Sequence, residues 1–121
     1  MAQRILVVED DPEIVRLMQK ILGTLYEVEV SPNGLEALKR LDLDPLPDLL
    51  IVDVMMPHLD GLSLLRTLRT RPRTARLKSM IVSAKTGPRD VIEGINVGVK
   101  HYLTKPFKVD DLLNKVKKIL A

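Results

Sequence analysis

One stretch near the start of the chain indicates its fold: Ile5-Leu6-Val7-Val8-Glu9-Asp10-Asp11-Pro12. Four consecutive aliphatic residues are typical of a strand buried on both faces, as in a parallel sheet. Three acidic residues follow at once, and Asp11-Pro12 is the pattern of a helix N-cap followed by proline in the first helical turn. The stretch therefore predicts a buried strand that leads into a helix through an acidic turn.

The same succession of strand and helix recurs along the whole chain. Short apolar runs predict strands at residues 5–8, 28–30, 49–52, 80–82 and, more weakly, 102–103. Apolar residues at helical spacing predict helices around 14–22, 35–41, 62–68, 91–95 and 112–120. Turn and cap residues agree with these boundaries, namely Gly23, Ser31-Pro32-Asn33-Gly34, Asp60 and Asp90.

This alternation predicts an α/β fold with a five-stranded parallel sheet, right-handed crossovers and helices on both faces. Of the doubly wound arrangements we expect the flavodoxin-like (βα)5 fold with strand order 2-1-3-4-5. The order is taken from known folds of this type and does not follow from the spacing.

Composition narrows the class of protein. The chain has 121 residues, of which 45% are hydrophobic and 2% aromatic, so we expect one domain, residues 1–121, with an aliphatic core. The few aromatics disfavour a base-stacking nucleic-acid surface, and the absence of Cys excludes disulfides and thiolate metal sites. No apolar run is long enough to span a membrane, and the first residues do not resemble a signal peptide. We therefore expect a cytoplasmic protein with no membrane partner.

The net charge of +3 conceals an asymmetry between the two halves of the chain. Residues 1–60 hold twelve acidic and five basic residues, whereas residues 61–121 hold four acidic and fourteen basic ones. Solvated helix faces that differ in sign would explain this, and so would an acidic pocket combined with a basic partner surface. We favour solvation for most of the bases and a pocket for a subset of the acids.

Polar side chains follow four of the expected strands, where ligands bind in open α/β sheets. Glu9 and Asp10 follow the first strand, and Asp53 follows the third. Carboxylates this close repel one another unless a cation intervenes, and Mg²⁺ prefers such oxygen ligands. Lys105 after the fifth strand and Ser83 after the fourth could contact a phosphate, although each alone would be an ordinary surface or loop residue. Together these residues favour phosphoryl transfer to a carboxylate nucleophile.

The motifs resemble those of the response-regulator receiver domains of two-component signalling, over essentially the whole chain. The matching segments, in order, are residues 5–11, 50–57, Asp60-Gly61, 82–85 and 102–107. Each segment alone is weak, but their order and spacing together are highly specific.

The resemblance implies a role for each site residue. Asp53 would accept a phosphoryl group from a phosphohistidine of a sensor histidine kinase or phosphotransfer protein. Mg²⁺ would be bound by Asp10, Asp53 and the main-chain carbonyl of Met55, and by Glu9 through water. Lys105 would pair with Asp53 and then with the phosphoryl group. Such a domain catalyses its own phosphorylation and slow dephosphorylation and is not otherwise an enzyme.

The resemblance also implies a conformational switch. Ser83 would move toward the phosphoryl group, and the ring of Tyr102 would enter the vacated space. This would alter the face made by the fourth helix, the fifth strand and the fifth helix, which contacts an output domain or downstream partner. A partly buried ring that simply fills the fifth strand is the alternative for Tyr102. The resemblance further implies a cis peptide before Pro106.

Several positions depart from the family pattern. Relatives that form a symmetric dimer carry acids where Lys100 and His101 stand, which counts against that dimer, and homodimerisation on phosphorylation stays open. Gly87-Pro88 replaces polar loop residues. The basic residues of 66–76 and 115–118 accompany no recognition-helix motif, so we expect no direct nucleic-acid binding and favour solvation or an acidic partner.

Two rival functions were weighed against the receiver. A degenerate receiver would act as a constitutive interaction domain, but the complete set of site residues disfavours it. A metal-dependent phosphatase would need a second acid two residues after Asp53, where Met55 stands, and a substrate cap. The cognate kinase and the output remain open.

Overall fold

The structure is a computed structural model that describes residues 2–54, 59–84, 96 and 98–121. Its five strands form one parallel sheet in the order β2-β1-β3-β4-β5, as predicted. The strands are β1 (Arg4–Val8), β2 (Glu27–Ser31), β3 (Leu49–Val52), β4 (Ser79–Ser83) and β5 (His101–Thr104).

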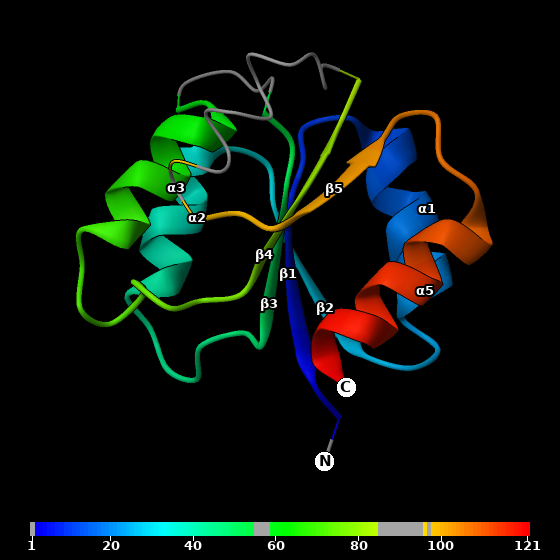
Figure 1. Cartoon of the computed structure of the whole chain (residues 1–121), viewed down its shortest axis with the longest axis horizontal. Coiled ribbons are helices and arrows are strands. Elements are labelled where there is room, and N and C mark those ends of the chain that lie inside the picture. Colours follow the sequence, from blue (N-terminus) through cyan, green and yellow to red (C-terminus); the bar gives the residue numbers. More distant parts are fainter. Residues whose placement is uncertain (1, 55–58, 85–95, 97) are drawn as a thin grey trace.

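Helices cover both faces of this sheet (Figure 1). They are α1 (Pro12–Leu22), α2 (Gly34–Leu41), α3 (Gly61–Arg69) and α5 (Val109–Leu120). In Figure 1, α2 and α3 lie on one face and α1 and α5 on the other. The helix predicted around 91–95, together with Asp90 and Gly87-Pro88, lies outside the described residues.

Side chains cap the first three helices as their sequences indicate. Asp11 accepts a hydrogen bond from the Glu13 amide at 2.9 Å, and Asp60 accepts one from the Ser63 amide at 2.9 Å. Both bonds satisfy amides that have no partner inside the helix. Asn33 caps α2 in the same way. Gly23 ends α1 with a φ of −64°, so it ends the helix without the left-handed conformation that glycine often supplies.

The central strands are buried on both faces, which explains their continuous apolar runs. Because side chains alternate along a strand, each run supplies two cores. One core lies beneath α2 and α3 and includes Leu6, Val8, Leu50 and Val52. The other lies beneath α1 and α5 and includes Ile5, Val7, Leu49 and Ile51. Each fully buried aliphatic side chain contributes roughly 1.5–3 kcal/mol, so the cores hold the sheet and its rim in place.

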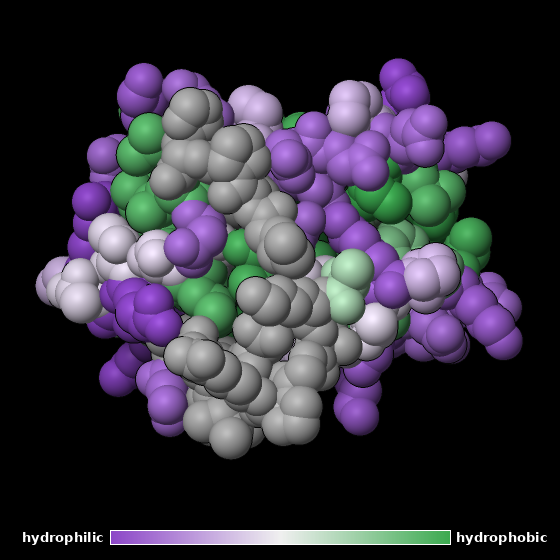
Figure 2. All heavy atoms as spheres, turned by 90° about the horizontal axis from the view of Figure 1, so that it is seen from above, coloured by the Kyte–Doolittle hydropathy of each residue, from purple (hydrophilic) through white to green (hydrophobic). Residues whose placement is uncertain are grey.

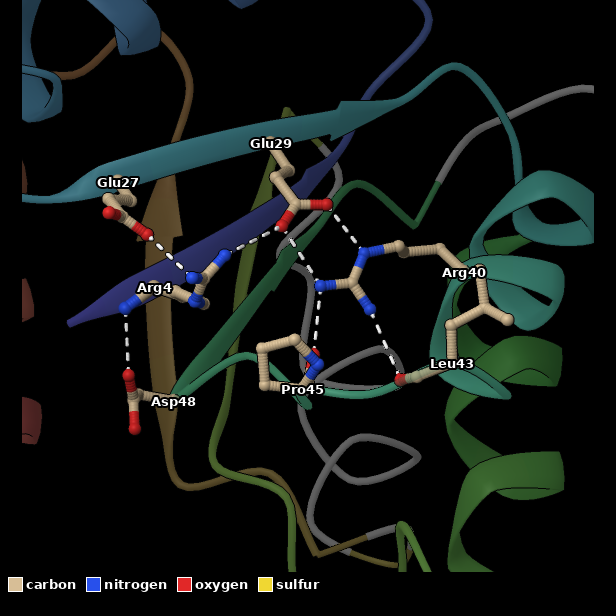
Figure 3. A network of polar contacts seen from close by, with 7 residues as sticks. All are labelled: Arg4, Glu27, Glu29, Arg40, Leu43, Pro45 and Asp48. Atoms are coloured by element: carbon tan, nitrogen blue, oxygen red, sulfur yellow. Dashed lines mark hydrogen bonds and ion pairs between the residues drawn. The ribbon is translucent and has the colours of Figure 1, made fainter.

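A network of charged side chains joins β2 to the end of α2 (Figure 3). The guanidinium of Arg40 donates to both carboxylate oxygens of Glu29, at 2.5 and 2.9 Å. It also donates to the carbonyls of Leu43 and Pro45, at 3.4 and 2.9 Å. The hydrogen bonds from Arg40 lower the pKa of Glu29 despite its partial burial. The network therefore ties the chain after α2 to the sheet.

Arg4 extends this network at the start of β1. Its guanidinium lies 3.2 Å from Glu27 and 3.7 Å from Glu29, and its amide donates to Asp48 at 2.7 Å. Each of these acids thus faces a guanidinium or an amide of the protein itself (Figure 3). We refer to Arg4, Glu27, Glu29, Arg40 and Asp48 as the amino-end network.

Candidate functional site

Backbone hydrogen bonds extend the sheet by one residue beyond three of its strands. The amide of Glu9 donates to Ser31, that of Asp53 to Val8, and that of Lys105 to Ser83, each at 3.1 Å. Since the strands are parallel, their carboxyl ends meet at one rim. The sheet therefore holds the backbones of Glu9, Asp53 and Lys105 at that rim.

The side chains at this rim converge. The Nζ atom of Lys105 donates to Oδ2 of Asp53 at 3.0 Å and also to Oε1 of Glu9. The other oxygen of Glu9 accepts the amides of Asp10 and Asp11, at 3.0 and 3.3 Å. Glu9 is thereby held by the lysine on one side and by the turn into α1 on the other. The sequence analysis predicted the pair of Lys105 with Asp53 but not its pair with Glu9.

Three carboxylates gather here around a single ammonium. Oxygens of Glu9, Asp10 and Asp53 lie within 4.8 Å of one another. Glu9 is 3% exposed and Asp53 is 7% exposed, whereas Asp10 is open to solvent. We refer to Glu9, Asp10, Asp53 and Lys105 as the rim cluster. Figure 2, which views the molecule from this side, shows hydrophilic side chains gathered between hydrophobic patches.

Burial and charge act differently on the members of the rim cluster. Burial raises the pKa of Glu9 to about 7, and the charge of Asp53 adds to this effect, although the hydrogen bond from Lys105 opposes it. Burial disfavours the ammonium of Lys105, but its hydrogen bonds to Glu9 and Asp53 prevail and raise its pKa. The cluster is thus short of positive charge. Carboxylates in this number are the ligands of a hard divalent cation, so the residues present fit Mg²⁺.

The structure also places most of the remaining residues singled out from the sequence. Ser83 is buried, and Tyr102 is partly buried with its hydroxyl donating to the carbonyl of Val99 at 3.4 Å. Tyr102 pairs with Ile81, and Ser83 lies two residues beyond Ile81, so Ser83 and Tyr102 face the same side of the sheet. Burial raises the pKa of Tyr102. Met55 lies outside the described residues, so its carbonyl ligand stays a prediction.

Two further features concern the backbone near Asp53 and Lys105. The peptide between Lys105 and Pro106 is cis, as the resemblance implied. Gly61, for which the sequence suggested no role, begins α3 against the backbone of Asp53. A β-carbon at Gly61 would lie 2.3 Å from the carbonyl oxygen of Asp53. The Asp60-Gly61 pair was a visible signal, but the reason for the glycine is a contact across the fold.

The sequence matches the family described as "Response regulator receiver domain" over residues 5–117. The chain belongs to this family. The resemblance inferred from the motifs is confirmed, and it places the chain among the receiver domains of two-component response regulators. This is a signalling family and not one of conventional enzymes.

Curated relatives of this receiver domain are longer proteins. It is 39% identical over 114 residues to response regulator PleD of Caulobacter vibrioides, covering 93% of this chain and 24% of PleD. It is 36% identical over 121 residues to response regulator MprA of Mycobacterium ulcerans, covering 99% of this chain and 51% of MprA. A sensor histidine kinase, TmoS of Ectopseudomonas mendocina, is 35% identical over 118 residues, or 98% of this chain and 12% of TmoS. The chain thus spans at most about half the length of these relatives.

Solved receiver structures share the fold. The chemotaxis protein CheY4 of Vibrio cholerae superposes with a TM-score of 0.91 at 28% identity, over 98% of this chain and 99% of CheY4. A manganese-bound form of response regulator Rcp1 superposes with a TM-score of 0.83 at 29% identity, over 97% and 91% of the two chains. Within the residues that the structure describes, none of the helices has the length and apolar content of a membrane span.

Proposed function

We propose that this receiver domain accepts a phosphoryl group on Asp53 in a reaction that depends on Mg²⁺. One observation carries the proposal: a buried aspartate at the rim of the sheet is oriented by Lys105 at 3.0 Å and lies beside two further carboxylates. Asp53 would be the nucleophile, and Glu9, Asp10 and Asp53 would hold the metal together with the predicted carbonyl of Met55. The manganese-bound neighbour Rcp1 supports a divalent ion in folds of this kind.

The chemistry asked of the chain is mainly positioning. A carboxylate oxygen of Asp53 forms a bond to phosphorus while the bond from phosphorus to the donor nitrogen breaks, and the nitrogen keeps the electron pair. Lys105 holds the carboxylate in one orientation beforehand and offers its ammonium to the phosphoryl oxygens that arrive. When bound, Mg²⁺ would neutralise part of the negative charge at the site.

Phosphorylation would then act on the fold through Ser83 and Tyr102. The phosphoryl group brings strong acceptor oxygens to the rim, and the hydroxyl of Ser83 can donate to them. Two charge-assisted hydrogen bonds of roughly 1.5–3 kcal/mol each approach the ~5.5 kcal/mol that inverts a 1:99 population. Movement of Ser83 would free space on the face that Tyr102 shares, so the ring could turn inward. The surface of β5 and α5 would change as a result.

The partners follow from this role and from the relatives. The phosphoryl donor would be a sensor histidine kinase or a phosphotransfer protein, and the switched face would contact an output domain or a downstream protein. Relatives named as response regulators and as a sensor histidine kinase show that such domains occur in larger signalling proteins. Self-catalysed loss of the phosphoryl group to water would end the signal.

Intact-mass measurement with a small phosphodonor tests the proposal. With acetyl phosphate and Mg²⁺ the chain should gain the mass of one phosphoryl group, and Asp53→Asn should not. Asp48→Asn is the matched control, because Asp48 lies at the opposite end of the sheet. Omission of Mg²⁺ should suppress the gain. An unmodified wild-type chain, or a gain that persists in Asp53→Asn, would show the proposal to be wrong.

A further inference from the structure

A hollow lies at the end of the sheet opposite the rim cluster. It has a volume of about 540 Å³ and is bounded by the chain between α3 and β4, the first residues of β4 and β5, and the C-terminal end of α5. Figure 1 shows the end of α5 and the chain before β4 together at the end of the molecule where β1 begins. Pockets for small molecules commonly measure roughly 300–1,000 Å³, so the hollow is of ligand size.

Basic side chains from separate parts of the chain converge on this hollow. They are Arg69, Arg76, Lys78, Lys100, His101 and Lys118. None of its described lining residues is acidic. Arg76, Lys100 and Lys118 are exposed, and none of the three has an ion-pair partner among the residues that the structure describes. The local charge is therefore positive and uncompensated by the described lining.

Structural roles account for some of these cations. Lys78 donates to the carbonyl of Ile119 at 3.1 Å and so caps the end of α5, where a positive charge also complements the helix dipole. Arg69 donates to the carbonyl of Leu77 at 2.9 Å and to the hydroxyl of Ser79 at 3.1 Å. Lys118, in the last turn of α5, can serve the helix dipole as well. No such contact holds Arg76 or Lys100, which nevertheless face the same hollow.

Apolar atoms complete the lining. Leu77 and Ile119 contribute to the wall, between the basic groups. His101 is partly buried beside them, and burial together with Lys115, Lys118 and Lys100 lowers its pKa, so its imidazole is neutral at pH 7. A neutral imidazole can donate a hydrogen bond to an anion that the lysines attract. Concave shape, apolar wall and clustered cations suit a compact ligand better than a long, flat polymer.

We propose that this hollow binds a small polyanion that carries several negative groups close together, of the kind found in a di- or triphosphate. The site is separate from the rim cluster and does not depend on the proposed phosphorylation. Lys100 and Lys118 would contact the anionic groups from opposite sides, and Arg76 would close the third. Charge-assisted hydrogen bonds contribute about 1.5–3 kcal/mol each, so each lysine should matter measurably.

Tripolyphosphate in metal-free buffer is the probe, because without Mg²⁺ the acidic rim cluster repels it. Titration followed by NMR should give saturable shifts in the amides of residues 77–79 and 98–101, and it should raise the pKa of the His101 imidazole. Lys100→Glu and Lys118→Glu should each weaken binding about tenfold, as expected for loss of one charge-assisted contact. Lys117→Glu is the matched control. It changes net charge and the end of α5 equally, but Lys117 does not line the hollow.

Three further arms make the result decisive. Asp53→Asn should bind tripolyphosphate as the wild type does, which separates this site from the phosphorylation. Lys100→Gln should weaken binding less than Lys100→Glu, and thermal unfolding of each variant verifies that it is folded. Inorganic phosphate should bind more weakly than tripolyphosphate.

The proposal is overturned by any of three results. One is the absence of saturable binding, and another is a loss in Lys117→Glu equal to that in Lys118→Glu, which would indicate net charge alone. The third is a single-stranded oligonucleotide that binds equally well to wild type and Lys100→Glu with shifts spread over α3. That result would point to a nucleic-acid surface and not to this hollow.

Discussion

The rim cluster and the amino-end network are two groups of charged side chains on one sheet, and they differ in how their charge is balanced. In the amino-end network each acid faces a guanidinium or an amide, and the pKa of Glu29 is lowered chiefly by its hydrogen bonds from Arg40. In the rim cluster three carboxylates share one lysine, and burial raises the pKa of Glu9 to about 7. The first group is satisfied by the protein itself. The second has room for a further cation.

Burial sharpens this difference. Glu9 and Asp53 are less than a tenth exposed, whereas the side chains of Glu27 and Glu29 are 52% and 38% exposed. Water screens the exposed pairs, so each contributes little to stability. A buried carboxylate without a partner is costly, so loss of the lysine should matter far more at the rim. The comparison predicts a graded series of effects.

Replacement of Lys105 should have the largest effect. Lys105→Met leaves Glu9 and Asp53 buried without their cation, so we expect a loss of about 3 kcal/mol in the free energy of unfolding without Mg²⁺. Arg40→Met should cost no more than about 1 kcal/mol, because Glu29 remains partly solvated. Urea unfolding measures both. Lys108→Met, an exposed lysine nearby, is the control.

Added Mg²⁺ sharpens the same comparison. It should restore part of the stability of Lys105→Met and none of that of Arg40→Met, because ligand binding stabilises only the state that holds the site. Equal losses in the two variants, or equal rescue by Mg²⁺, would contradict the distinction between the clusters.

A methyl group at Gly61 should have the next largest effect. Gly61→Ala pushes the start of α3 away from the carbonyl of Asp53, and overpacking of this kind costs typically 1–3 kcal/mol. The same displacement should slow phosphorylation of Asp53 by acetyl phosphate. The measurements are urea unfolding and the rate of mass gain. Ser63→Ala, in the same turn of α3, should leave the phosphorylation rate within about twofold, since only part of the cap contact is lost.

The smallest effect should come from Glu29. Its pKa is lowered in the folded chain, so its charge stabilises the fold above the ordinary value of 4.5 and this contribution is lost as the pH falls through the lowered pKa. Glu29→Gln should therefore cost less than about 1 kcal/mol at pH 7. The difference from wild type should shrink at acid pH. A difference that stays constant from pH 7 to pH 3 in urea unfolding would show that the charge of Glu29 plays no part.

Much of the fold and of the site could be predicted from local patterns. Continuous aliphatic runs such as Leu49–Val52 identify buried strands, and Asp11 and Asp60 mark helix starts by the same cap chemistry that the structure shows. Acids placed directly after such strands identify the rim, because parallel strands end at one edge. The strand order came from the resemblance to a known fold, since spacing alone does not choose among doubly wound arrangements.

Other features depend on residues that are distant in the chain. The contact of Lys105 with Glu9 joins residues 96 positions apart, and no local pattern states which carboxylate a lysine will choose. The reason for glycine at Gly61 is the backbone of Asp53, and the hollow beside His101 is built from four separate segments.

The sequence by itself therefore determined which segments are strands and helices, and which polar residues reach the carboxyl ends of the strands. It could do so because hydrophobic periodicity and caps act within a few residues. Only the tertiary structure decided that Glu9 shares Lys105 with Asp53 and that basic side chains surround one hollow at the other end. Those arrangements depend on how strands order and helices pack, and packing is decided by the whole chain together.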